Sequence, residues 1–272
     1  MPVLYVVATP IGNLEDVSLR ALRTLREVKL IAAEDTRKTK RLLVTYNIET
    51  PMTSYYEENK RTKLDYILGC LESEDVALVS EAGTPGISDP GYELVVACAR
   101  RGIQIVPIPG PSTIITALVV SGLPTDRFNY IGFLPHKANG RRHILQSIAE
   151  EYGTIVALES PHRLLASLSD ILLVLGDRRV AVCRELTKVH EEVFRGTISQ
   201  AIEHFIEPRG EFTLVIEGKG AKDKPRLTAD IERQLHDMRL AGATAKEAIV
   251  RVAEETGLSK RGLYQVWLKE RS

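Results

Sequence analysis

The chain has 272 residues, of which 44% are hydrophobic and 26% charged, and its 36 basic residues balance its 36 acidic ones. This profile is typical of an ordinary folded protein that is long enough for two domains. A neutral total argues against a strongly basic nucleic-acid-binding domain, although local basic clusters can still bind phosphates. No apolar run approaches the ~20 residues of a membrane helix, and the N-terminus lacks the pattern of a secretory signal. We therefore expect a cytoplasmic protein that does not bind membranes.

The chain shows no pattern for a metal site or a disulfide framework. Its three cysteines, Cys70, Cys98 and Cys183, lie far apart and form no C-x-x-C pair. An odd number of cysteines at this spacing argues against both kinds of site. The carboxylates show no clustered ligand pattern either, so we expect no metal.

Predicted strands and helices alternate through the first half of the chain. Short apolar runs bounded by turns predict buried strands, with amphipathic helices between them. These strands are expected at residues 3–8, 30–33, 76–79 and 103–106. Such alternation is typical of a parallel sheet with helices on its faces, and it places every strand-to-helix loop at the carboxyl edge of the sheet. We predict an α/β domain over residues 1–122.

A second alternation follows a turn-rich link at residues 122–126. Its strands are expected at residues 130–133, 154–158, 180–183 and 212–216. We predict a second α/β domain over residues 127–218.

Residues 219–226 have the composition of a linker, and residues 227–272 are expected to form a small helical domain. Thr228 and Ser259 are expected to cap its first and third helices, and Gly257 to end the second. Thr244 and Glu247 form a capping-box pattern. The spacing fits a helix-turn-helix, but a plain helical bundle explains it about as well, so RNA binding by this part stays open.

Three loops rich in Gly and Pro are predicted at the carboxyl edge of the first sheet, together with one charged loop. Such loops let backbone N–H and C=O groups touch a ligand directly. The three loops are Thr9–Leu14, Ser80–Pro90 and Pro107–Thr113, and the charged one is Ala33–Arg37. None has the pattern of a phosphate-binding NTPase loop or of a dinucleotide-binding loop. Three such loops at one edge favour a small-molecule site over plain turns.

These loops and two later motifs resemble a known family, the tetrapyrrole-methylase-like methyltransferases. The later motifs resemble the branch of that family that methylates the ribose of a decoding-centre cytidine in small-subunit (16S) ribosomal RNA. The residues that carry the resemblance are Thr9–Leu14, Ala33–Arg37, Ser80–Pro85, Gly110–Ser112, Glu159–Arg163 and Arg184–Glu192. Glu81 is a departure, because the family more often has Asp there.

The resemblance implies a homodimer of two-domain subunits that bind S-adenosylmethionine (SAM) in the cleft between the domains. The substrate would be small-subunit ribosomal RNA, or the assembled small subunit. By this resemblance the cofactor-binding residues would be Pro10, Ile11, Gly83, Thr84, Pro85, Ile87, Ser112, Thr113, Leu158, Phe212 and Thr213.

A ribose hydroxyl is a poor nucleophile near neutral pH, so it needs a proton acceptor or a cation that stabilises the developing alkoxide. Glu159, Glu185 and His162 are candidate acceptors, whereas Arg163, Arg184 and Lys188 are candidate cations. The competing interpretation is that these charged residues form ion pairs that hold elements together.

A basic run follows the charged loop. Arg37, Lys38, Lys40 and Arg41 are expected to contact RNA phosphates beside the cleft. Solvated helix faces explain most such runs equally well.

Two other functions remain open at this point. The same fold could methylate a tetrapyrrole or another small molecule, because fold alone does not specify the substrate. A non-enzymatic nucleic-acid-binding protein is the more distant alternative, and it leaves the three loops without a purpose.

Overall fold

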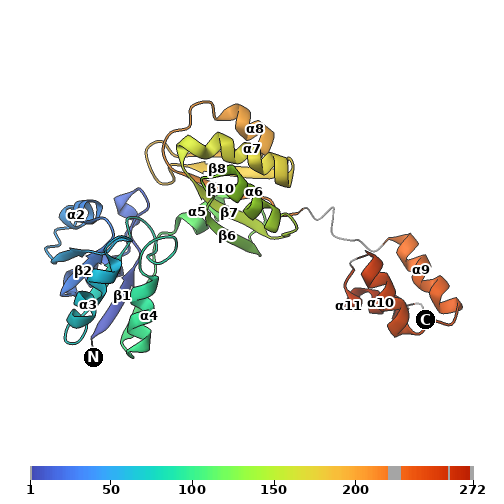
Figure 1. The fold of residues 1–272 in the computed structure, drawn as a ribbon, viewed down its shortest axis with the longest axis horizontal. Coiled ribbons are helices and arrows are strands. Elements are labelled where there is room, and N and C mark those ends of the chain that lie inside the picture. The colour runs from blue at the N-terminus through green and yellow to red at the C-terminus, as the bar shows by residue number, and fades with distance from the viewer. Residues whose placement is uncertain (1, 220–227, 257, 270–272) are drawn as a thin grey trace. The chain divides into compact units, whose positions relative to one another are not determined.

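The computed structural model describes residues 2–219, 228–256 and 258–269 (Figure 1). The chain divides into two compact units. One consists of Met1–Ala149 and Gly153–Glu217, and the other of Glu150–Tyr152 and Gly218–Ser272. The first unit contains two five-stranded sheets, which bears out the α/β class predicted from the sequence.

The first sheet is parallel throughout and has the strand order β3-β2-β4-β1-β5. Its strands are β1 (Val3–Val7), β2 (Leu30–Ala33), β3 (Met52–Ser54), β4 (Val76–Val79) and β5 (Gln104–Ile108). β3 was not predicted, because it has three half-buried residues at the edge of the sheet and so lacks a continuous apolar run.

Helices cover both faces of this sheet. Ile31 and Val79 pack in one core with α1 (Leu19–Glu27) and α2 (Thr36–Thr45). Ala32 and Leu78 pack in another core with α3 (Lys60–Cys70) and α4 (Tyr92–Arg100). Because neither face meets water, the central strands are apolar at every position instead of alternating.

The second sheet is mixed, with the order β6-β7-β10-β8-β9. β6 and β7 are parallel, and the other neighbours are antiparallel. Its strands are β6 (Phe128–Phe133), β7 (Thr154–Glu159), β8 (Arg179–Arg184), β9 (Glu192–Thr197) and β10 (Phe212–Ile216). β9 was not predicted either. It is an edge strand whose residues are half-buried or exposed.

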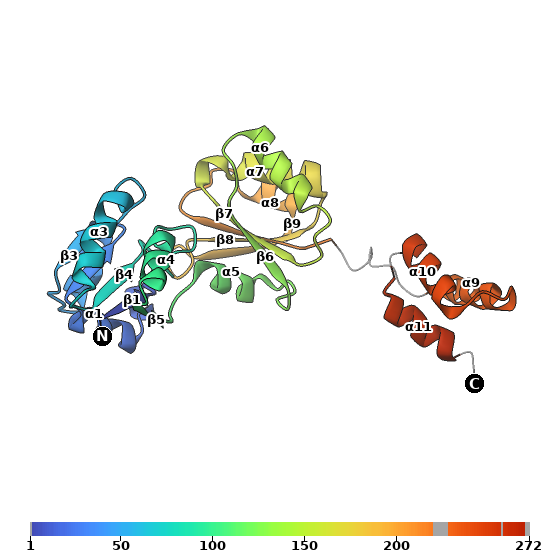
Figure 2. The same ribbon diagram turned by 60° about the horizontal axis from the view of Figure 1, so that its bottom comes forward.

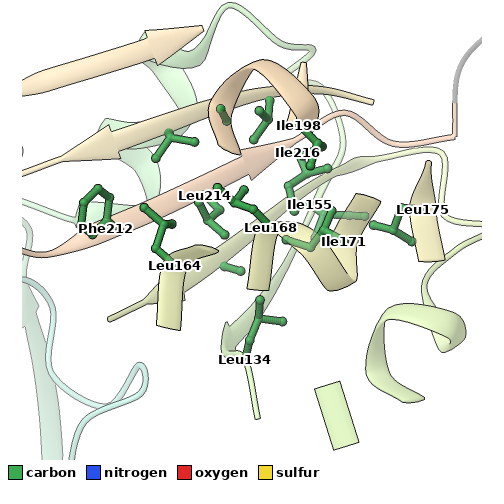
Figure 3. Close-up of a cluster of buried hydrophobic side chains, with 14 of the residues drawn as sticks. Leu134, Ile155, Leu164, Leu168, Ile171, Leu175, Ile198, Phe212, Leu214 and Ile216 are labelled. Carbon is green, nitrogen blue, oxygen red and sulfur yellow. The ribbon is translucent and has the colours of Figure 1, made fainter. Parts of the chain in front are cut away.

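The two faces of the second sheet are covered differently. α6 (Ala138–Ser147), α7 (Leu164–Leu175) and α8 (Ile198–His204) lie on one face, and α5 (Thr113–Ser121) lies on the other (Figure 2). Figure 3 shows the core on the first of these faces, in which Leu168 and Ile171 of α7 meet Ile155 of β7 and Leu214 of β10.

α5 links the two halves of this unit. It follows β5 of the first sheet, yet its Ala117 and Leu118 pack against Val156 and Val215 of the second sheet. The division into domains at residues 1–122 and 127–218 stays a prediction, because residues on both sides of it belong to one compact unit.

The second unit contains α9 (Ala229–Leu240), α10 (Ala245–Thr256) and α11 (Lys260–Lys269) around a core with Leu235 and Trp267. The expected caps are present. The Thr228 hydroxyl accepts from Ile231 N, Thr244 and Glu247 form the capping box, and the Ser259 hydroxyl accepts from Gly262 N. The helix end expected at Gly257 and most of the expected linker lie outside the described residues. Among the residues described in either unit, no helix is long and apolar enough to cross a membrane.

Candidate functional site

The loops at the carboxyl edge of the first sheet are joined to each other by hydrogen bonds. Thr9 and Gly83 exchange two backbone hydrogen bonds, of 2.8 and 3.0 Å, and so link the loops after β1 and β4. The charged loop after β2 is held to the same rim, because Glu34 accepts a 2.8 Å hydrogen bond from Glu81 N. The parallel sheet therefore brings the predicted loops together into one rim.

A cleft of about 450 Å³ lies between this rim and the ends of β7 and β10. We call it the large cleft. Eight of the predicted cofactor-binding residues line it: Gly83, Thr84, Ile87, Ser112, Thr113, Leu158, Phe212 and Thr213. Pro10 and Ile11 instead line a neighbouring cleft, and Pro85 lines neither of the two.

The large cleft offers three kinds of contact to a ligand. Ile87, Leu158 and Phe212 provide apolar surface. The Ser112 side chain makes no cap hydrogen bond, so the first N–H groups of α5 are open to an anionic group. Carboxylates in the lining contribute negative charge. This set suits a ligand with an apolar body and groups of both charges.

Five carboxylates line the large cleft: Glu34, Glu81, Asp89, Glu159 and Glu211. Burial and the nearby charge of Glu34 raise the pKa of Asp89 from 3.8 to about 7. Burial also raises the pKa of Glu34. Asp89 was not among the site residues predicted from the sequence. Its only signal was its position within the loop Ser80–Pro90.

The neighbouring cleft, of about 350 Å³, shares Glu81, Ala82 and Glu211 with the large cleft. We call it the small cleft. Three cations line it, Lys38 and Arg41 of α2 and Lys188 of the loop after β8. The carboxylates Glu81 and Glu211 line it too, so the cations outnumber the carboxylates by one, which favours an anionic ligand.

The four residues predicted to bind RNA lie in different surroundings. Lys38 forms an ion pair with Glu81. Arg41 is exposed and makes no side-chain hydrogen bond or ion pair with any residue that the structure describes. Arg37 is paired with Asp35 at 3.2 Å. Neither Arg37 nor Lys40 lines the small cleft.

Lys188 lies between two carboxylates. Its Nζ is 3.0 Å from Glu185 Oε1 and 3.0 Å from Glu211 Oε2. These carboxylates raise the pKa of Lys188, although burial opposes them, and the ammonium and nearby N–H groups lower the pKa of Glu185. Glu211 was missed in the sequence, where only its position before β10 would have pointed to it.

Glu159 and Arg163 form a buried ion pair at 2.8 Å. Glu159 also accepts hydrogen bonds from Ser160 N and the Ser167 hydroxyl. Arg163 donates at 2.8 Å to the Leu134 carbonyl. Both side chains are thus engaged, as the ion-pair interpretation expected, and a direct part in the chemistry stays a prediction for each of them.

His162 lies in a single 3-10 turn, Pro161–Arg163, and is exposed. In the part of the chain that the structure describes, it has no side-chain partner, and it lines neither cleft. Its proposed part as a proton acceptor is therefore also a prediction.

The fold and the large cleft define the class of the protein. Residues 3–202 match the sequence model of the family described as Tetrapyrrole (Corrin/Porphyrin) Methylases. Two solved structures share the fold. Diphthine synthase has a TM-score of 0.65 at 12% identity, over 79% of this chain and 90% of that one. Uroporphyrin-III-C-methyltransferase from Thermus thermophilus has a TM-score of 0.57 at 20% identity, over 79% and 94%.

Relatives of higher sequence identity show to which branch of this methylase family the chain belongs. A protein of Halalkalibacterium halodurans is 48% identical over 98% of this chain and 95% of its own length. One of Synechocystis is 48% identical over 99% and 98%, and one of Thermotoga maritima is 52% identical over 79% and 98%. All three carry the name ribosomal RNA small subunit methyltransferase I. The chain belongs to the ribosomal RNA small subunit methyltransferase I family.

Proposed function

We propose that this chain transfers a methyl group from SAM to the ribose 2′-hydroxyl of a decoding-centre cytidine in small-subunit ribosomal RNA. The names of the relatives and the motifs Glu159–Arg163 and Arg184–Glu192 support the substrate. One structural observation carries the proposal. The cleft lined by most of the predicted cofactor-binding residues shares Glu81, Ala82 and Glu211 with a second cleft, which is lined by three cations.

The large cleft fits a methyl donor of this kind. Its volume of about 450 Å³ lies within the usual range of small-ligand sites. The open N–H groups at Thr113 would hold the amino-acid carboxylate, and Glu34 and Asp89 would face the cationic groups. Ile87 and Leu158 would pack against the adenosine. When bound, SAM supplies an electrophilic methyl group on a positively charged sulfur.

On the substrate side, Lys38 and Arg41 would hold phosphates, so that a ribose in the small cleft faces the shared wall. Fixing the hydroxyl in line with the methyl group supplies much of the rate in such transfers. The hydroxyl also needs a proton acceptor. The predicted candidates remain Glu159, Glu185 and His162, and Glu159 lines the large cleft.

We also propose that the protein acts in the cytoplasm, needs no metal and forms a homodimer. The helix α5 supports an interface between copies, because Ile115 and Val119, one turn apart, are 48% and 65% exposed. Binding of RNA by the helical unit stays open.

The test is transfer of a tritiated methyl group from SAM to small subunits that lack the modification, followed by mapping of the labelled nucleotide. We expect label on one cytidine, in a form that resists alkaline cleavage because the 2′-hydroxyl is blocked. Label on a base would contradict ribose methylation. Transfer to a tetrapyrrole, with none to RNA, would support the small-molecule alternative instead.

A further inference from the structure

Phe133, the last residue of β6, is a large apolar side chain that the fold leaves uncovered. It is 56% exposed and lines the large cleft, together with Leu158, its partner in β7. The next residue, Leu134, is 1% exposed and lies in the core beside α7 (Figure 3). Leu134 thus anchors the chain in the core while Phe133 faces the cleft.

The backbone before Phe133 departs from a regular strand. The pairing of β6 with β7 shifts register between Tyr130 and Phe133. Gly132, within this shift, has a φ of +69°, a conformation that favours glycine. Irregularities of this kind bend a strand and redirect its side chains, often beside active sites. The position of Phe133 therefore depends on a specific local structure.

The loop after Phe133 is fixed by two arginines that bind three successive carbonyl groups. Arg163 donates at 2.8 Å to the Leu134 carbonyl, and Arg141 donates at 3.2 and 3.3 Å to those of Pro135 and His136. Each arginine is paired with a buried carboxylate. Arg163 pairs with Glu159, and Arg141 with Asp170 through a 2.7 Å hydrogen bond from Nε.

These pairs hold backbone carbonyls that would otherwise be free to move with the loop. Buried ion pairs of this kind are costly to break, because each leaves an unpaired charge behind. The loop beside the cleft is therefore rigid before any substrate binds. This gives Glu159 and Arg163 a positioning function that needs no contact with the reacting atoms.

The rigid loop presents two polar side chains to solvent, His136 and Lys137. Both are exposed, and neither makes a side-chain hydrogen bond or ion pair with the residues described here. Arg141, by contrast, is buried and points to the loop carbonyls. The exposed part of this segment therefore carries the aromatic ring of Phe133 and, four residues later in the sequence, the ammonium of Lys137, which has no partner among the described residues.

We propose that this loop is a binding site for single-stranded RNA, in which Phe133 stacks on a base next to the target nucleotide and Lys137 binds an adjoining phosphate. Unpaired RNA bases bind to proteins largely by stacking on aromatic rings, and lysines neutralise the backbone. Phe has no polar atom, so it would accept any base. The inference rests on the proposed function, because it takes ribosomal RNA as the substrate.

The ring is tested with three substitutions in the full-length protein, Phe133→Ala, Phe133→Leu and Phe133→Tyr. Methyl transfer is measured against the concentration of unmodified small subunits, and SAM binding is measured by calorimetry. We expect Phe133→Ala and Phe133→Leu to raise KM for the subunit roughly tenfold, whereas Phe133→Tyr stays close to the wild type. Because Phe133 lines the large cleft, SAM affinity is measured for all three variants, and it should change much less than KM for the subunit.

Lys137 is tested by charge reversal. Lys137→Glu should weaken binding of the subunit and reduce the dependence of log K on log salt by about one or more, while Lys137→Arg preserves both. Lys29→Glu is the matched control. Lys29 is exposed and directly precedes β2, at the end of the sheet opposite to the loops.

Three results would overturn the inference. Phe133→Leu could behave like the wild type, which would exclude stacking. SAM affinity could fall together with activity, which would mean that the ring contacts the adenine of the cofactor. The variants could change the oligomeric state, which would make the loop an interface between copies. If the wild-type protein transfers no methyl group to the subunit, it is the proposed function that fails.

Discussion

The backbone N–H of Asn13 donates a 3.0 Å hydrogen bond to the hydroxyl of Thr187, and so joins the loop after β1 to the loop after β8. This second loop is tightly wound, since Glu185 and Thr187 have φ values of 49° and 67°. It carries Lys188 to the wall of the small cleft. The position of Lys188 thus depends on a contact between two segments that are far apart in the sequence.

Gly12 allows this contact, because a Cβ at that position would lie 2.5 Å from Lys188 Cγ and 2.9 Å from the Leu186 carbonyl oxygen. We expect Gly12→Ala to displace the loop that carries Lys188 and to lower kcat/KM for methyl transfer at least tenfold. Displacing a catalytic or binding group by about 1 Å can slow a reaction by this factor or more. Gly69→Ala is the control, because nothing lies within 4 Å of a Cβ there. Full activity in Gly12→Ala would show that the loop is free to move without loss.

Glu159 has two competing interpretations, and stability separates them. If Glu159 mainly compensates the charge of Arg163, Glu159→Gln should lower the free energy of unfolding by about 3 kcal/mol, as loss of one partner of a buried pair does. Urea denaturation measures this. Arg37→Gln, which breaks the exposed pair with Asp35, should change stability little. Unchanged stability with intact SAM binding and lost turnover would favour the proton acceptor instead.

Much of the fold follows from the sequence alone. The central strands of the first sheet are apolar at every position, so the local sequence alone identifies them as buried strands. β3 and β9 lie at sheet edges and lack such apolar runs. Their extended conformation depends on pairing with the adjacent strand, which the local sequence does not reveal. α5 is apolar around most of its circumference, so its periodicity could not indicate that it packs on the second sheet.

The site could be predicted where it depends on strand order. Loops that follow parallel strands meet at one edge, so the loops after β1 and β4 were expected to lie close together, and Thr9 and Gly83 join them by hydrogen bonds. The environments of single side chains depend on contacts between distant segments. Neither the burial of Asp89 nor the pairing of Glu211 with Lys188 leaves a local pattern in the sequence.

Asp89 should make SAM binding depend on pH. Its pKa of about 7 means that it is protonated below neutrality and charged above it. A cationic ligand favours the charged form, so SAM should bind more weakly as the pH falls below about 7 and should release protons there. Calorimetry in two buffers of different ionisation enthalpy measures this release. Asp89→Asn should abolish it, whereas a pH-dependence that persists in this variant would point to another group, such as Glu34.

The raised pKa of Asp89 should also make the stability of the folded protein depend on pH, in the opposite direction to SAM binding. The folded protein binds the Asp89 proton more tightly than the unfolded chain, whose pKa is near 3.8, so the contribution of this group to stability declines as the pH rises from about 4 through 7. We expect Asp89→Asn to raise the melting temperature above pH 7 and to change it little below pH 4. A lower melting temperature at high pH would mean that the carboxylate is stabilised by its surroundings.

Arg41 and Arg37 lie on the same helix but in different surroundings, and this allows a matched test of RNA binding. Arg41 lines the small cleft and has no described side-chain partner, whereas Arg37 is paired with Asp35 and lies outside that cleft. We expect Arg41→Gln to weaken binding of the small subunit and to lower its salt slope by about one, because one phosphate contact is lost. Arg37→Gln should have the smaller effect. Equal effects, or none from Arg41→Gln, would mean that RNA does not enter the small cleft along α2.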